Sequence, residues 1–169
     1  MVFKFFSYFF LIFFSTTLFA QDYLLKMKPF LNLGLAKIMA DACEKHQKKN
    51  RYNPVNIAIV DDGADLILFR RQNNAFLLSI EIAQKKAKSS AGIPYPTRKI
   101  EEIVYGNKDG KPGRAPGLAH SKDVVAFAGG LPIKTKDGAL IGAIGISGAT
   151  ADQDEKCAAA ALKAIEDFL

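Results

Sequence analysis

Residues 127–155 are the part of the chain that most limits the fold it can adopt. Within them, Lys136-Asp137-Gly138 separates two apolar runs, LPI and ALIGAIGI. Asp-Gly between β-favouring runs is a strong hairpin signal, because the turn requires residues that tolerate positive φ. Thr150 and Gln153 follow with the spacing of a helix capping box. We therefore expect a β-hairpin that leads directly into a C-terminal helix at residues 151–168.

The second apolar run carries glycines at intervals of three, namely Gly142, Gly145 and Gly148. Side chains alternate between the faces of a strand, so this spacing leaves bare backbone on both faces. Two interpretations stay open: close packing against a helix or a second subunit, and a surface that receives a flat ligand. The spacing is not the G-x-G-x-x-G of a dinucleotide site. Asp152 and Asp154, in the first turn of the following helix, would also repel an anion.

The first twenty residues have the pattern of a secretory signal peptide. Lys4 supplies a positive charge, residues 5–19 are mostly apolar, and Ala20 is a small residue at the cleavage position. The apolar run is shorter than the roughly 20 residues of a membrane helix. We expect a signal peptide at 1–20 and a single exported domain, periplasmic or secreted, at 21–169. An uncleaved anchor is the alternative.

The whole chain has a net charge of +6, and removal of Lys4 leaves 6 − 1 = +5. The basic residues are scattered in small clusters that lack interleaved aromatic residues, so nucleic acid is a poor partner. A small acidic molecule is the better expectation.

Cys43 and Cys157 are the two cysteines of the chain. Their spacing excludes a C-x-x-C redox motif and a metal-binding motif. An oxidising compartment permits a disulfide between them. The alternative is two buried apolar thiols, and the alanine-rich surroundings of both residues favour this second interpretation.

The rest of the chain alternates helical and β patterns. We expect helices at 30–49, 76–91, 97–105 and 151–168, and strands at 55–60, 66–69 and 124–128 besides the two of the hairpin. Residues 106–117 form a Gly-, Lys- and Pro-rich loop of a length that is either functional or mobile. Strand pairs joined by tight turns predict an α+β domain in which helices pack on an antiparallel five-stranded sheet.

Several sequence blocks closely resemble the GlcG/HbpS-like family of haem-binding and haem-degrading domains. They are a turn of the V-x-D-x-G type (VDDGA at residues 60–64), SIEIAQKKA, YPT, GGLP, and GAIGISG followed by QDE. The resemblance covers nearly all of residues 21–169. It implies a profilin-like sandwich, assembly into homo-oligomers, and non-covalent haem as the cofactor. Ala64 departs from the family pattern, which commonly has a second turn glycine there. The other departures are Arg71, Gln72, His120, Ser121 and the lysine-rich stretch 108–114.

Candidate haem ligands are few. His46 and His120 are the two histidines, so a bis-histidine site would need both. His46 would equally suit the negative end of the first helix. The resemblance points to Thr97 as a haem-contacting hydroxyl, and capping of the next helix is its alternative role. Covalent attachment is excluded, because the C-x-x-C-H motif is absent.

Candidate anion-binding residues are Arg70, Lys86 and Arg98, which could meet haem propionates or a small acid. Arg70 follows a strand and Lys86 sits on a mostly apolar helix, so both could face one pocket. Ser147 and Glu155 complete the set of ligand-binding candidates. No nucleophile elbow or metal-ligand cluster is evident, so no catalytic residue is assigned.

The sequence therefore predicts an exported, homo-oligomeric haem-binding domain, in which haem degradation would be a secondary activity. Two alternatives remain: a binding protein or accessory enzyme for a small hydroxy or keto acid such as glycolate, and a non-catalytic oligomeric scaffold.

Overall fold

The computed structural model describes residues 28–169, so the expected signal peptide and its cleavage position lie outside the described residues. The elements in chain order are α3 (Leu33–Lys49), β1 (Asn56–Asp61), β2 (Leu66–Arg71), α4 (Ser79–Gly92), α5 (Thr97–Tyr105), the 3-10 turn η1 (Pro116–His120), β3 (Gly130–Lys134), β4 (Leu140–Ser147), α6 (Ala151–Lys163) and η2 (Glu166–Phe168). None of the described helices combines the length and the apolar character needed to cross a membrane.

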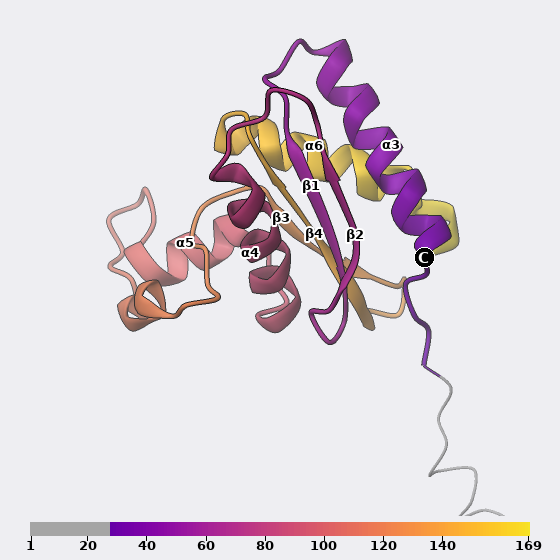
Figure 1. The fold of residues 1–169 in the computed structure, drawn as a ribbon. Coiled ribbons are helices and arrows are strands. Elements are labelled where there is room, and N and C mark those ends of the chain that lie inside the picture. Colours follow the sequence, from indigo (N-terminus) through magenta and orange to yellow (C-terminus); the bar gives the residue numbers. More distant parts are fainter. Residues whose placement is uncertain (1–27) are drawn as a thin grey trace, which may run out of the picture.

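The sheet has four antiparallel strands in the order β2-β1-β4-β3 (Figure 1). The α+β prediction is confirmed, but the prediction of a fifth strand at 124–128 is wrong. In that segment the Val125 amide donates to the Ser89 hydroxyl at 2.8 Å, and the same hydroxyl donates to the Asp123 carbonyl at 3.2 Å. The segment therefore bonds to a helix side chain, and pairing begins only at Gly130.

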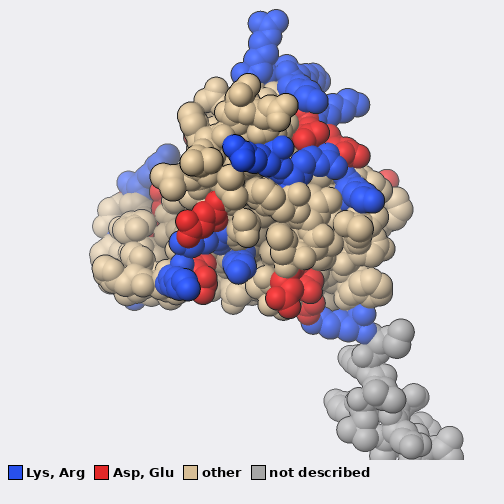
Figure 2. Space-filling model, in the orientation of Figure 1, with Lys and Arg blue, Asp and Glu red and all other residues tan. Residues whose placement is uncertain are grey.

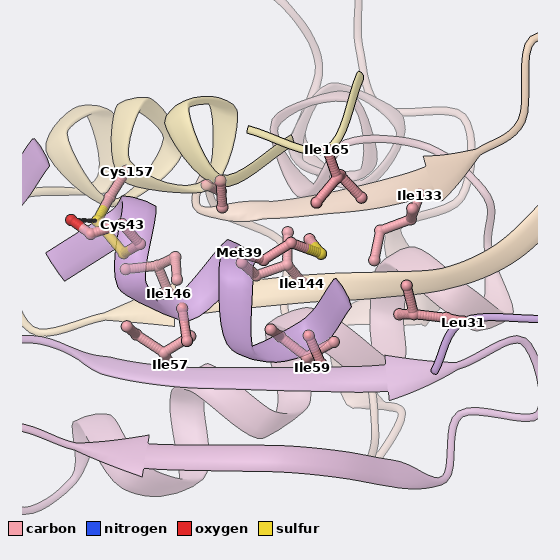
Figure 3. Close-up of a cluster of buried hydrophobic side chains, with 14 of the residues drawn as sticks. Leu31, Met39, Cys43, Ile57, Ile59, Ile133, Ile144, Ile146, Cys157 and Ile165 are labelled. Carbon is pink, nitrogen blue, oxygen red and sulfur yellow. Dashed lines mark hydrogen bonds between the residues drawn. A yellow bond between two sulfur atoms is a disulfide. The ribbon is translucent and has the colours of Figure 1, made fainter. Parts of the chain in front are cut away.

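Helices cover both faces of the sheet, with α3 and α6 on one side and α4 and α5 on the other (Figure 1). The alternation of β1 explains this arrangement, since residues two apart share a face. Ile57 and Ile59 join a large core with α3 and α6, whereas Ala58 and Val60 join a smaller one with α4. The larger core is filled mainly by isoleucines from β1, β3 and β4 (Figure 3).

Small residues allow α3 and α6 to approach closely, and a disulfide joins them. Cys43 and Cys157 are bonded across a Cα–Cα distance of 4.8 Å, and both are fully buried (Figure 3). The interpretation as two free thiols is therefore wrong, and the disulfide interpretation is confirmed. Ala40 and Ala158 lie in the same core. The alanines that suggested buried thiols are the residues that let the two backbones come within bridging distance.

The helix ends follow capping chemistry. Asn32 caps α3 by accepting from the Leu35 amide at 2.9 Å, so this helix begins three residues later than predicted. The capping box of Thr150 and Gln153 on α6 is confirmed. The helix ends at Lys163 and is followed by η2, so the prediction of one continuous helix to 168 is wrong.

The segment before α4 differs most from its prediction. The helix begins at Ser79 rather than at residue 76, without a side-chain cap. Phe76, Leu77 and Leu78 are consequently outside the helix, with 63 %, 74 % and 75 % of their surface exposed.

Candidate functional site

Gly142 and Gly145 of β4, and Gly148 directly after it, are packing residues. A Cβ atom on Gly145 would lie 2.1 Å from the carbonyl oxygen of Ala83 and 2.4 Å from the amide nitrogen of Ala87, both in α4. On Gly142 and Gly148 a Cβ atom would lie 2.3 Å from a backbone oxygen of a neighbouring segment. Helix α4 therefore rests directly on the strand backbone. The close-packing interpretation is confirmed, and the interpretation of this strand as a ligand surface is wrong.

Lys86 is fully buried and cannot meet a solvent-borne ligand in this conformation. Its ammonium group contacts the Asp154 carboxylate at 2.9 Å, donates to the carbonyl of Ile146 at 2.9 Å, and lies 4.7 Å from the centre of the Phe127 ring. Burial lowers the pKa of Lys86 and raises the pKa of Asp154, because both charges have lost their hydration. The direct contact between the two groups offsets part of that cost.

Arg70 and Arg98 also form ion pairs with carboxylates of the chain. Arg70 pairs with Asp41 at 2.6 Å and Glu44 at 3.4 Å, which ties β2 to α3. The hydrogen bond to Asp41 is the main reason that the pKa of the guanidinium is raised.

Arg98 pairs with Asp152 and, at 2.7 Å, with Glu155, which ties α5 to α6. The hydrogen bond from Arg98 lowers the pKa of the Asp152 carboxyl. Glu155 is therefore occupied as well. The prediction that Arg70 and Lys86 face one pocket is wrong, since Arg70 turns to the α3 side of the sheet and Lys86 to the α4 side.

Thr97 belongs to the same buried region as Lys86. Its side chain is fully buried, and its hydroxyl accepts from the Gly130 amide at 2.9 Å. The N-cap of α5 is Pro96, so the capping role predicted for Thr97 is wrong in its details. The burial also removes Thr97 as a haem-contacting hydroxyl in this conformation. Ser147, 5 % exposed and paired with Asn56 across the sheet, is enclosed in the same way.

Several of the sequence blocks that carry the family resemblance meet in this buried region. A Cβ atom on Gly129 would lie 2.6 Å from the Lys86 ammonium and 2.8 Å from the Asp154 Cβ, and one on Gly130 would lie 2.6 Å from the Thr97 methyl group. One polar contact region therefore contains residues from four of the blocks, namely Lys86, Thr97, Gly129, Gly130 and Asp154. The recurring motifs hold the two helix layers and the sheet together.

The two histidines lie on opposite faces of the sheet, so a bis-histidine site is not formed. His46 is partly buried in α3, with its ring 5.7 Å from that of Tyr52. Its Nε2 atom is buried and has no hydrogen-bond partner among residues 28–169. His120 is exposed in η1, which packs against α5. Of the two imidazoles, His120 is the one that a ligand can reach.

The loop after α5 forms an ordered basic rim beside His120. Its ends are bridged between Gly106 and Pro112, and Asn107 accepts from two loop amides at 3.1 Å. The Ala115 amide donates to the Ile103 carbonyl, which returns the chain along α5. The stretch predicted as either functional or mobile therefore has a defined conformation.

Two open hollows flank this loop. One, of about 350 Å³, is lined by Arg98, the end of α5 and residues 106–109, and the other, of about 210 Å³, includes Lys111 and Arg114. Lys108, Lys111 and Arg114 form no ion pair within residues 28–169. Tyr105, at the end of α5, is 66 % exposed. The loop thus combines free cations, an aromatic ring and, through η1, an accessible imidazole.

Sequence reasoning missed the acidic partners of the three cations. Asp41 and Glu44 are three residues apart on α3, a spacing that puts both on one helix face, so their joint binding of a cation could have been inferred. Asp154 was assigned only to helix-dipole complementarity. No local pattern pairs Asp154 with Lys86, which lies 68 residues away.

Comparison with known proteins agrees with this arrangement. The model of the family described as "haem degrading protein HbpS-like" matches residues 31–163. Protein GlcG of Escherichia coli K12 is 30 % identical over 73 % of this chain and 85 % of its own length. The crystal structure of HbpS has a TM-score of 0.72 at 27 % identity, covering 83 % of this chain and 93 % of that one. The crystal structure of a PduOC:heme complex has a TM-score of 0.70 at 28 % identity, covering 81 % of this chain and 96 % of that one.

The fold and the buried motif residues thus define an α+β domain with a four-stranded antiparallel sheet between two helix layers. The chain belongs to the HbpS-like family.

Proposed function

We propose that this protein binds haem non-covalently in an open site on the side of the molecule formed by α5, η1 and the loop between them. Membership of the HbpS-like family is the observation that carries the proposal, and a structural relative in complex with haem supports it. The two hollows on this side, of about 350 and 210 Å³, are open to solvent. That size suits a cofactor held at the surface rather than one enclosed in the core.

His120 is the residue we propose as the iron ligand. It is exposed, whereas the Nε2 atom of His46 is buried and Thr97 is fully enclosed. Neutral imidazole is a common axial ligand of haem iron. Lys108, Lys111 and Arg114 would meet the propionates, because these cations are not bound to carboxylates of the described chain.

Hemin titration of the mature protein tests this proposal. The Soret band should shift and saturate, and His120→Ala should weaken binding at least about tenfold, the effect of losing roughly 1.4 kcal/mol. His46→Ala is the matched control and should leave the spectrum and the affinity unchanged. A saturable shift that survives His120→Ala but is lost in His46→Ala would contradict the assigned ligand, and no shift at all would contradict haem binding.

We also propose that the protein is exported. The Cys43–Cys157 disulfide supports this location, because disulfides persist in oxidising compartments and are rare in the cytosol. Mass spectrometry of the purified native protein should find an N-terminus at Gln21 and no free thiol. An intact Met1 with two reduced cysteines would contradict export.

We further propose that the protein forms a homo-oligomer through the apolar segment Phe76–Leu78. Three consecutive large side chains with more than 60 % of their surface exposed are unusual for a monomer, and such patches mark interaction surfaces. Light scattering on a sizing column should report an oligomer that Leu77→Asp dissociates. A monomer at all concentrations, or an oligomer unaffected by Leu77→Asp, would contradict this interface.

A further inference from the structure

A third hollow lies away from the loop beside His120, where α3 ends beside the end of β2. Its volume is about 450 Å³, and its lining includes Gln47, Lys48, Arg71 and Gln72. Basic side chains gather over the end of α3, at the top of the molecule in the common orientation of Figures 1 and 2. The hollow is on the α3 side of the sheet and shares no residue with the loop beside His120.

The floor of this hollow is a fixed chain of carboxamides. Gln47, only 7 % exposed, donates to the Tyr52 carbonyl at 2.6 Å, and Gln72 donates to the Gln47 side-chain oxygen at 3.2 Å. Gln72 in turn accepts from the Val55 amide at 2.8 Å. Each carboxamide has two N–H donors. Among residues 28–169, the side-chain nitrogen of each makes one hydrogen bond, so each of these two lining residues keeps one unused donor.

Two cations complete the lining. Lys48 and Arg71 make no ion pair within the described part of the chain, in contrast to Arg70, which is held by Asp41 and Glu44. A guanidinium presents a planar pair of donors that matches a carboxylate. Spare amide donors beside free cations are the chemistry of an anion site.

Glu44 limits the charge of the anion. Its carboxylate also lines the hollow and lies 3.4 Å from Arg70. A dianion such as sulfate would be repelled more strongly than a monoanion at the same distance. The same carboxylate can accept from a hydroxyl group of a ligand.

We propose that this hollow is a binding site for a small carboxylate monoanion, held by Arg71 and Lys48 and hydrogen-bonded by the amides of Gln47 and Gln72. The site is separate from haem binding and does not depend on it. Lactate is the probe, because it joins one carboxylate to one hydroxyl. Affinity in the millimolar range, about −4 kcal/mol, is expected for a ligand of this size.

The test is an NMR titration that follows the side-chain amides. Lactate should shift the carboxamide resonances of Gln47 and Gln72 saturably, while sodium chloride at matched ionic strength should not. Arg71→Gln should weaken lactate binding about tenfold through loss of a charge-assisted bidentate contact. Lys49→Gln, which removes a neighbouring charge outside the hollow, is the matched control and should not change the affinity.

Three results would overturn the proposal: shifts that never saturate, equal binding by Arg71→Gln, or sulfate binding more tightly than lactate. Hemin affinity should be the same in Arg71→Gln and the parent protein. The two tests are therefore independent: failure of hemin to bind would not affect the lactate result, and failure of lactate to bind would not affect the hemin result.

Discussion

Ala64 has a backbone conformation that its side chain disfavours. Its φ angle is +66°, in the tight turn between β1 and β2, where L-residues other than glycine carry a conformational cost. The departure from the family turn pattern is thus a strained position. Asp61 stabilises this turn, since its carboxylate accepts from the Gly63 and Asp65 amides at 2.9 Å.

Ala64→Gly should raise the free energy of unfolding by about 0.5–1 kcal/mol, since glycine relieves the positive φ at the loss of one half-buried methyl group. Urea denaturation measures the change. Ala164→Gly is the control, because Ala164 has a φ of −70° and glycine there should destabilise instead. Equal destabilisation by both variants would contradict the account of the turn.

Asp154 stabilises the protein by neutralising Lys86. Asp154→Asn should cost about 3–5 kcal/mol in free energy of unfolding, because it leaves a fully buried ammonium without its counter-charge. Asp152→Asn, two residues earlier and paired with Arg98 at the surface, should cost far less. Chemical denaturation of the two variants at pH 7 measures the two losses in free energy of unfolding. Similar losses in both would show that Lys86 does not depend on Asp154.

At the scale of elements, the close contact between α4 and β4 requires that Gly145 has no side chain. Gly145→Ala would put a methyl group within 2.1 Å of the α4 backbone, so the helix would have to move away from the sheet. We expect a loss of about 1–3 kcal/mol, the usual range for overpacking. Gly92→Ala, at the open end of the same helix, meets nothing within 4 Å and should be neutral or slightly stabilising. Thermal unfolding of the pair measures the difference, and equal behaviour would refute the packing role.

The disulfide connects α3 and α6 across 114 residues of sequence. Closing a loop of this length lowers the entropy of the unfolded chain, and removal should cost roughly 2–5 kcal/mol. The double variant Cys43→Ala, Cys157→Ala should therefore unfold at a lower urea concentration, and reductant should lower the midpoint of the parent protein but not of the variant. A parent protein insensitive to reductant, with thiols shown to be free, would contradict this contribution.

Elements that depend on local sequence patterns could be predicted from the sequence, whereas polar contacts between distant residues could not. The Asp-Gly hairpin, the capping box at Thr150 and the α+β class follow from local chemistry, and all three are confirmed. The segment 124–128 has β-favouring residues but bonds to Ser89, a choice that only the tertiary structure reveals. Lys86 and Arg70 were predicted to bind an anionic ligand, and their partners in the structure are carboxylates of the chain.

At the scale of the whole molecule, binding is separated from the motif-rich centre. Lys86, Thr97, Asp154 and the glycines of the GGLP and GAIGISG blocks are buried, and they hold the two helix layers against the sheet. The unpaired cations, the accessible imidazole and the hollows lie away from that centre, at the end of α3 and around the loop that follows α5. The chemistry of binding is therefore expected in these two regions, while the centre supplies stability.

We propose that haem binds on the α5–η1 side of the molecule and not at the glycine-bearing strand. NMR spectra recorded with zinc protoporphyrin, a diamagnetic haem substitute, can locate the bound porphyrin. The account predicts that perturbed backbone amides cluster in residues 98–122, around His120 and the basic loop. Perturbations centred on residues 142–148, with residues 98–122 unchanged, would contradict this site.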